Sequence, residues 1–200
     1  MDIAAIVSLS AISVLIAADR GLSYDQRVAE WIQRQGQGRP LLDKAMFAIT
    51  HFGDTEAILL ATAVFAIILI RLSKRRRPAV ALLITLALAF AINNGLKFLF
   101  ARSRPQLSAL IIDPASYSYP SGHAMISTAV YGCTAILLSE IFPKRRWLFR
   151  VVAAVLVFGI GLSRVYLDAH WPSDVLGGFA AGWITVSAVH SWYLRQPAPR

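Results

Sequence analysis

The sequence contains a single cysteine, Cys133, which excludes an internal disulfide and a cysteine-based zinc site. Charged residues are also scarce: they make up 16% of the 200 residues, whereas an ordinary soluble domain has about a quarter. Hydrophobic residues take their place, at 56%, and the mean hydropathy is +0.57. This composition predicts an integral membrane protein, in which Cys133 is a small packing residue.

Acidic residues are scarcer than basic ones, with 11 against 20, so the formal net charge is +9. An excess of this kind indicates a nucleic-acid partner when the basic residues form a stripe or a tail. Here they lie in the gaps between apolar runs, and we therefore expect no nucleic-acid partner.

Six apolar runs can be marked along the chain, at residues 3–18, 57–72, 79–101, 124–142, 147–162 and 175–194. Unpaired backbone groups find no water in lipid, so each run is predicted to be a helix. The first run has Asp2 and no lysine or arginine ahead of it, which favours a retained span over a cleaved signal peptide. The predicted fold class is all-α: one domain, residues 1–200, built as a bundle of six transmembrane helices.

The connections between the runs predict the orientation in the membrane. Residues 71–78 and 143–150 are dense in arginine and lysine without an acid, and Arg195 and Arg200 follow the last run. With six spans these stretches fall on one side, which the positive charge makes cytoplasmic. We therefore expect a multi-pass cell-membrane protein with both termini in the cytoplasm. Four basic residues then lie on the extracytoplasmic side, against this rule, and a local function has to explain them: Lys97, Arg102, Arg104 and Arg164.

The first extracytoplasmic connection contains a further helical pattern at residues 25–34. Val28, Trp31 and Ile32 are spaced for one helical face, with charged residues opposite. This pattern predicts a short helix in the membrane interface, with Trp31 at headgroup depth. A solvated loop helix fits the same pattern.

Two glycines stand out in the last run. Gly178 and Gly182 form a G-x-x-x-G pattern, which allows close approach of a second helix. The pattern predicts close packing within the bundle or a contact in a dimer, and the oligomeric state stays open.

A first cluster of polar residues follows the third run. Lys97 and Arg104 are seven residues apart, about two helical turns, so they share a face if the helix persists that far. Pro105 disfavours helix at the preceding residue, which predicts that the helix ends at Arg104. The two cations would then lie at the mouth of a span.

The second cluster, Pro120, Ser121, Gly122 and His123, comes directly before the fourth run. Ser121 is a natural N-cap, and Gly122 lets a ligand approach the backbone. The free amides of a helix start favour an anion. The cluster therefore predicts an anion site with a histidine beside it.

The third cluster, residues 163–174, separates the last two runs. His170 and Asp174 are four residues apart, so one helical turn begun near Pro172 would bring the carboxylate beneath the imidazole. Arg164 offers a forked donor that matches phosphate oxygens.

Each cluster alone has a plain structural interpretation, as headgroup anchors, a helix cap or an aromatic interface belt. His51 and His190 stand outside any cluster and are interpreted as structural. Together, however, the clusters bring cations, an anion-binding helix start, two histidines and an acid to one face. Phosphoryl chemistry needs that set: cations and amides for the equatorial oxygens, a nucleophile, and an acid for the leaving oxygen.

The three clusters resemble the signature motifs of the type 2 phosphatidic acid phosphatase family, also called the lipid phosphate phosphatase and haloperoxidase superfamily. In this sequence they are written K-x6-RP (residues 97–105), PSGH (residues 120–123) and SR-x5-H-x3-D (residues 163–174). All three are complete and in the family's order. With six spans, the chain is similar to the small bacterial enzymes of the family's membrane branch.

The resemblance implies a role for each residue. His170 would attack phosphorus and carry a phosphohistidine, while Asp174 would hold the other ring nitrogen. His123 would protonate the leaving oxygen and then activate water. The phosphate-binding residues would be Lys97, Arg104, Ser121, Gly122 and Arg164.

The implied function is a metal-independent phosphatase that removes the terminal phosphate of a membrane lipid on the extracytoplasmic face. Undecaprenyl pyrophosphate, phosphatidylglycerol phosphate and phosphatidic acid are candidate substrates. A lipid phosphotransferase that uses the same intermediate stays an alternative, as does a non-catalytic lipid-phosphate carrier or flippase, which would not need His170 paired with Asp174. A vanadate haloperoxidase is disfavoured because those members are soluble. We expect no cofactor and no metal, since carboxylates suited to magnesium are few; Asp113 and Asp168 are the ones that can be named.

Overall fold

The computed structural model describes residues 22–36, 39–105 and 117–195, together with residues 7, 10–13 and 16. Throughout these residues the regular structure is helical, which confirms the all-α fold class. The elements, in chain order, are α2 (Leu22–Gly36), α3 (Pro40–Thr50), η1 (His51–Gly53), α4 (Thr55–Ser73), α5 (Arg77–Phe100), α6 (Gly122–Ile141), η2 (Pro143–Arg145), α7 (Arg146–Tyr166) and α8 (Pro172–Arg195).

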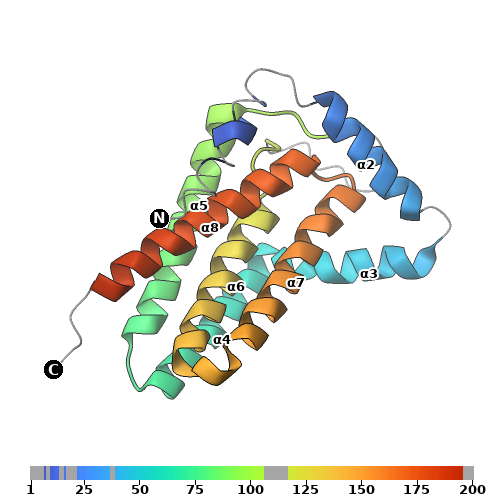
Figure 1. Cartoon of the computed structure of the whole chain (residues 1–200). Helices are drawn as coiled ribbons and strands as arrows, with labels where there is room; N and C mark the ends of the chain where they lie inside the picture. The colour runs from blue at the N-terminus through green and yellow to red at the C-terminus, as the bar shows by residue number, and fades with distance from the viewer. Residues whose placement is uncertain are drawn as a thin grey trace.

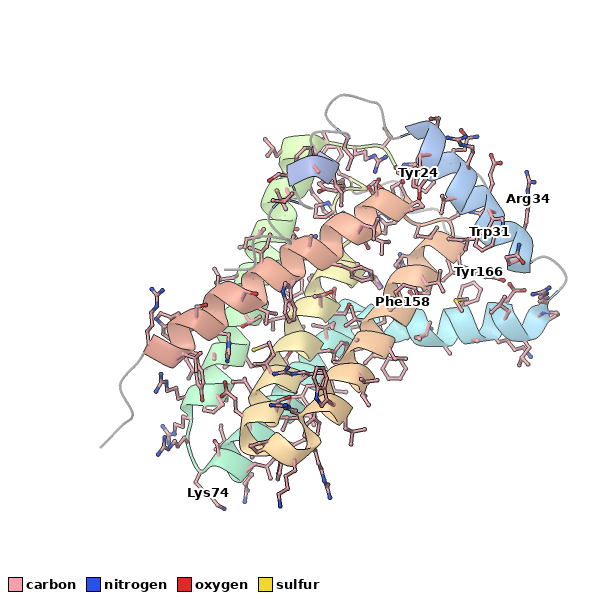
Figure 2. The ribbon with its side chains drawn as sticks, in the orientation of Figure 1. Tyr24, Trp31, Arg34, Lys74, Phe158 and Tyr166 are labelled. Carbon is pink, nitrogen blue, oxygen red and sulfur yellow. The ribbon has the colours of Figure 1, made fainter. Side chains whose placement is uncertain are left out.

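From α4 to α7, each helix runs antiparallel to the one before it in the chain. Helix α8 crosses these helices at a tilt (Figure 1). At one end of the bundle α5 and α7 end, and α4, α6 and α8 begin. We call this the motif end, because the three sequence motifs lie there. The arginine-rich stretches, residues 71–78 and 143–150, lie at the opposite end, where Lys74 is labelled (Figure 2). The bundle thus separates the motifs from the basic stretches.

Helix α6 is the centre of the bundle. In its most apolar 18-residue window 67% of the residues are buried, against 17–33% in the windows of the other three long apolar helices. Its side chains share one apolar cluster with all four neighbouring helices, including Ile58, Leu82, Ile160 and Val186. The outer helices therefore keep broad apolar faces for lipid: on α4, for example, Leu60 is 68% exposed.

The central helix also carries polar side chains, and their hydrogen bonds explain why it tolerates them. Thr128, Thr134 and Ser139 each donate a hydroxyl hydrogen bond to the carbonyl oxygen four residues earlier, at 2.6, 2.8 and 2.6 Å. These buried hydroxyls are satisfied within α6 itself. The neighbouring helices can therefore pack against α6 without supplying polar partners for them.

Two glycines set the spacing between α8 and α6. A Cβ atom at Gly178 would lie 2.8 Å from the carbonyl oxygen of Ser121, and one at Gly182 would lie 2.5 Å from the carbonyl oxygen of Met125. Both distances are too short for any side chain, so α8 can lie this close only with glycine at these positions. The G-x-x-x-G pattern therefore serves packing within the bundle.

Among the residues that the structure describes, four segments are long and apolar enough to cross a membrane: α4, α5, α6 and Pro143–Tyr166, which joins η2 to α7. They correspond to the second to fifth predicted runs. The sixth run coincides with α8, a 24-residue helix that is not among these four. Most of the first run, and the tail after residue 195, lie outside the described residues; those described within the first run are helical, and the Ser13 hydroxyl lies 3.0 Å from that of Tyr119. The count of six spans therefore stays a prediction.

The first long connection folds into two helices, α2 and α3, beside the bundle (Figure 1). The helix expected at residues 25–34 lies within α2. Its buried side includes Asp25 and Ala29, each 1% exposed, whereas Trp31 is 63% exposed. Figure 2 shows the Arg34 side chain pointing away from the bundle near the end of α2, and Tyr24 is 62% exposed. The placement of α2 in the membrane interface stays a prediction.

We predict that Gly182→Ala lowers the melting temperature of the purified protein in detergent by several degrees, because the new methyl group meets the backbone of α6. Gly95→Ala is the matched control: a Cβ atom at Gly95 has nothing within 4 Å, and alanine favours a helix by about 0.5–1 kcal/mol over glycine. Its melting temperature should be unchanged or higher. Equal melting temperatures for the two variants would show that Gly182 does not control the helix spacing.

Candidate active site

The first motif lies at the end of α5. The helix ends at Phe100, and Ala101 adopts a left-handed conformation with φ of 43°. The prediction that the helix continues to Arg104 is therefore wrong: Lys97 lies in the last turn, and Arg104 lies in the non-helical stretch beyond it. This stretch runs beside the loop after α7, where Arg104 donates a hydrogen bond to the carbonyl oxygen of Ala169 at 2.7 Å.

The second motif begins α6. Ser121 is the N-cap, as predicted, and its Oγ accepts a hydrogen bond from the backbone nitrogen of Ala124 at 3.5 Å. The Ser121 nitrogen donates to the carbonyl oxygen of Asp174 at 3.0 Å, which ties the start of α6 to the start of α8. On the other side, Nδ2 of Asn93 on α5 donates a hydrogen bond to the carbonyl oxygen of Pro120 at 3.4 Å, and a Cβ atom at Gly122 would lie 3.3 Å from Oδ1 of Asn93. The first turn of α6 is therefore held by two neighbouring helices.

The third motif closes the end of α7. The carbonyl oxygen of Arg164 accepts hydrogen bonds from the backbone nitrogens of Ala169 and His170, at 3.0 and 3.1 Å. Asp168, which lies between the end of α7 and Ala169, takes a left-handed conformation with φ of 60°, and this tightens the turn. The Arg164 side chain is buried and donates to Oγ1 of Thr50 at 2.9 Å. Arg164 thus positions the loop of His170 through its backbone and reaches α3 with its guanidinium.

His170 and Asp174 form a buried pair, 2% and 0% exposed. Nδ1 of His170 lies 3.4 Å from Oδ2 of Asp174. The other ring nitrogen, Nε2, lies 3.4 Å from a guanidinium nitrogen of Arg104. The acid and the arginine therefore contact opposite nitrogens of the same ring.

Burial controls the charge of this pair. Desolvation lowers the pKa of His170 to about 3, and the hydrogen bond and charge of Asp174 oppose the change only in part. Burial would raise the pKa of Asp174, but His170, Arg102 and Ser118 together hold it below its ordinary value. At neutral pH the pair is therefore a neutral imidazole beside a carboxylate, the state in which a histidine can act as a nucleophile.

Asp174 has further partners that the sequence motifs did not reveal. Its Oδ1 accepts a hydrogen bond from Arg102 at 2.5 Å, and its Oδ2 accepts from the Trp171 nitrogen at 2.9 Å and from the Ser118 hydroxyl. Arg102 also donates to Asp25 of α2 at 2.7 Å. None of the three charged side chains is more than 8% exposed. This buried triad, Asp25–Arg102–Asp174, joins α2 to the start of α8.

His123 of the second motif also has an acidic partner. Its Nε2 lies 2.9 Å from Oδ1 of Asp54, the residue before α4. The other oxygen of Asp54 lies 2.7 Å from Nδ1 of His51. The interpretation of His51 as a residue outside any cluster is therefore wrong, because the 3-10 turn η1 brings its ring back to Asp54. His190, by contrast, pairs with Glu140 at 2.6 Å toward the opposite end of the bundle.

The histidines of the second and third motifs share two cationic neighbours, because the charges of Arg104 and Arg164 act on both imidazoles. Lys97 donates a hydrogen bond to the carbonyl oxygen of Tyr117, in the segment that leads into the second motif. The three motifs are thus brought together at one end of the bundle. The role of Lys97 in holding phosphate stays a prediction.

The side chains at the motif end suit an anion better than a metal ion. Within the part of the chain that the structure describes, no group of three or more histidine, cysteine, aspartate or glutamate side chains could hold a metal. Asp168 accepts a hydrogen bond from Gln33 at 3.0 Å, and Asp113 lies outside the described residues. Guanidinium groups and helix-start amides bind oxyanions.

Comparisons with known proteins identify the family of the chain. Residues 78–198 match the family model of the PAP2 superfamily. The chain is 31% identical over 147 residues to phosphatidylglycerophosphatase B of Bacillus subtilis, an overlap of 72% of this chain and 71% of the relative. It is 36% identical over 154 residues to an undecaprenyl-diphosphatase of Sulfolobus acidocaldarius, an overlap of 74% of this chain and 69% of the relative.

The fold has a close counterpart among solved structures. A crystal structure of a transmembrane PAP2 type phosphatidylglycerolphosphate phosphatase from Bacillus subtilis matches it with a TM-score of 0.89 at 25% identity, over 99% of this chain and 98% of that one. The chain therefore belongs to the PAP2 superfamily, which confirms the resemblance of its motifs. It is a membrane phosphatase of this family, a hydrolase that acts on lipid phosphates.

We predict that Arg102→Ala lowers the free energy of unfolding by about 3–5 kcal/mol, because it leaves two buried carboxylates without their shared cation. Denaturant or thermal unfolding in detergent measures the change. Arg27→Ala is the matched control on α2, since Arg27 is exposed and donates to the backbone oxygen of Ser23; its effect should stay within about 0.5 kcal/mol. If both variants are equally stable, the triad does not hold α2 to the start of α8.

Proposed function

We propose that this protein hydrolyses the terminal phosphate of a membrane lipid phosphate or pyrophosphate through a phosphohistidine intermediate on His170. The observation that carries the proposal is the buried pair of His170 and Asp174, with the guanidinium of Arg104 3.4 Å from the ring nitrogen that Asp174 leaves open. A neutral imidazole beside a phosphate-binding cation supports attack on phosphorus.

In the proposed reaction, Nε2 of His170 attacks phosphorus while His123 gives a proton to the lipid oxygen that leaves. Asp174 accepts the Nδ1 hydrogen bond and stabilises the positive ring that phosphorylation creates. Water then attacks the phosphohistidine as His123 takes its proton, and inorganic phosphate departs. The phosphoryl oxygens are held by the phosphate-binding set, Lys97, Arg104, Ser121, Gly122 and Arg164.

The proposed substrates follow from the names of the relatives. One relative is a phosphatidylglycerophosphatase and another is an undecaprenyl-diphosphatase, so these two lipid classes, with phosphatidic acid, are the first to test. The reaction as proposed uses no cofactor and no metal.

The proposed location is the cell membrane, with residues 1–200 as one six-span domain. Both termini face the cytoplasm, and the motif end faces the extracytoplasmic side. The position of the basic stretches at the opposite end of the bundle supports this orientation.

A lipid phosphotransferase is the second candidate, because an acceptor hydroxyl can attack the same phosphohistidine in place of water. Incubation of the purified enzyme with a ³²P-labelled lipid pyrophosphate separates the two functions. Label in free phosphate supports hydrolysis, and label in a second lipid supports transfer. A carrier or flippase would release no labelled phosphate at all.

We predict that His170→Ala abolishes phosphate release from all three lipid classes, because it removes the imidazole that the proposed mechanism phosphorylates. Malachite-green detection of phosphate, with a metal chelator present, measures the loss, and acid-labile ³²P on the protein reports the intermediate. His190→Ala is the matched control, since His190 pairs with Glu140 away from the motif end. Full activity in the His170 variant would refute the assigned nucleophile.

We further predict that Arg104→Ala lowers kcat/KM by about 10²–10³-fold, the range found when a donor to a developing negative charge is removed. The reason is its position beside the attacking nitrogen of His170. Lys144→Ala, a removal of positive charge at the opposite end of the bundle, should leave kcat/KM unchanged. Similar rates for the two variants would place phosphate binding elsewhere.

A further inference from the structure

The carboxylate of Asp54 does not cap the helix that follows it. Asp54 is the N-cap of α4, where an aspartate ordinarily accepts a hydrogen bond from the first free amides of the helix. Here the side chain makes no capping hydrogen bond. Since such a cap contributes about 1 kcal/mol, a local stabilisation is missing at the start of α4.

Both oxygens of Asp54 contact histidines instead. Oδ1 lies 2.9 Å from Nε2 of His123, and Oδ2 lies 2.7 Å from Nδ1 of His51. The three side chains lead from the interior to the surface, with exposed fractions of 22% for His123, 41% for Asp54 and 72% for His51. The carboxylate therefore bridges a partly buried histidine of the second motif and a histidine at the surface.

The backbone next to Asp54 also fits the ring of His123. A Cβ atom at Gly53 would lie 2.7 Å from Cδ2 of His123, so this position has room for the ring only because it is glycine. Gly53 ends η1 and Asp54 follows it directly. Gly53 therefore leaves room for the ring of His123, and Asp54 contacts its Nε2.

The charge of Asp54 decides which nitrogen of His123 carries hydrogen. Partial burial raises the pKa of Asp54, but the hydrogen bonds and charges of His51 and His123 outweigh it and hold that pKa below its ordinary value. An ionised carboxylate only accepts hydrogen bonds, so Nε2 of His123 is the donor. This leaves Nδ1 as the nitrogen available for proton exchange in the proposed reaction.

We propose that Asp54 is a positioning residue for His123: it fixes the orientation and the tautomer of the ring and stabilises the protonated form that serves as general acid. His51 holds the second oxygen of the same carboxylate. The inference rests on the proposed function, in which His123 protonates the leaving oxygen. As the phosphorus–oxygen bond breaks, the proton on Nδ1 moves to the lipid oxygen, and the attacking water later returns a proton to Nδ1.

The test compares two monoesters that need the general acid to different degrees. Dodecyl phosphate has an alkoxide leaving group that must be protonated, whereas a nitrophenyl phosphate with the same alkyl chain has a leaving group that departs without help. The value of kcat/KM is measured for both, because it covers the steps up to the first irreversible one and so reports departure of the leaving group.

For Asp54→Asn we expect kcat/KM for dodecyl phosphate to fall by about 10–100-fold, part of the 10²–10⁴-fold that general acid catalysis contributes. For the nitrophenyl ester it should stay within about twofold of the wild-type value, since that ester does not need the acid. His123→Ala should show the same selectivity with a larger loss. Glu56→Gln, which removes an exposed acid in the first turn of the same helix, should change neither rate.

An equal loss on both esters, or no loss on either, would overturn the role of Asp54. A wild-type protein that cleaves neither ester nor any lipid phosphate would instead refute the proposed function itself. If Asp54→Asn does not yield a folded protein, His51→Gln replaces it. That variant should lose rate selectively on dodecyl phosphate by a smaller factor, and a uniform effect or none at all would count against the inference.

Discussion

The buried carboxylate of Asp174 is the contact on which the motif end depends. It is 0% exposed yet charged, and it accepts hydrogen bonds from Arg102, Ser118 and the Trp171 nitrogen while it faces His170. An isolated buried charge is strongly destabilising, so each of these partners must be in place. The turn after α5, the segment before α6 and the loop before α8 each supply one. A single side chain thereby couples both ends of the α5–α6 connection to the loop between α7 and α8.

Local spacing predicted those pairs of the candidate site that lie within one helical turn, and the resemblance to the family supplied Lys97, Arg104 and Arg164. Ser121 to His123 and His170 to Asp174 could be recognised because local spacing alone brings their atoms together. Asp25, Asp54 and Arg102 could not, because each contacts its partner through tertiary packing, and no spacing rule links a lone aspartate in a loop to a helix start elsewhere. The same packing explains why the prediction that α5 continues to Arg104 is wrong. The chain leaves the helix at Ala101, well before Pro105, and so brings Arg102 between two acids.

The membrane topology was predictable to a similar extent and for a related reason. Hydropathy detects helices that present apolar residues to lipid, which α4, α5 and the segment Pro143–Tyr166 do. Helix α6 also qualifies although most of its window is buried, so contact with protein does not separate the two groups. Helix α8 includes two glycines packed against α6 and His190 paired with Glu140, and residues of these types lower the hydropathy of a helix. A long apolar run and a helix that qualifies as a span are therefore not the same property, and the two differ here at α8.

The glycine contact between α8 and α6 also has a mechanical consequence. Gly178 leaves no space between α8 and the carbonyl oxygen of Ser121, and the Ser121 nitrogen is bonded to the carbonyl oxygen of Asp174. Any change in the angle between the two helices therefore strains the first turn of α6 and the start of α8 together. Transmembrane helices change tilt at modest cost when the hydrocarbon thickness around them changes. If α8 spans the membrane as predicted, a change in bilayer thickness that alters its tilt acts on the second and third motifs at the same time.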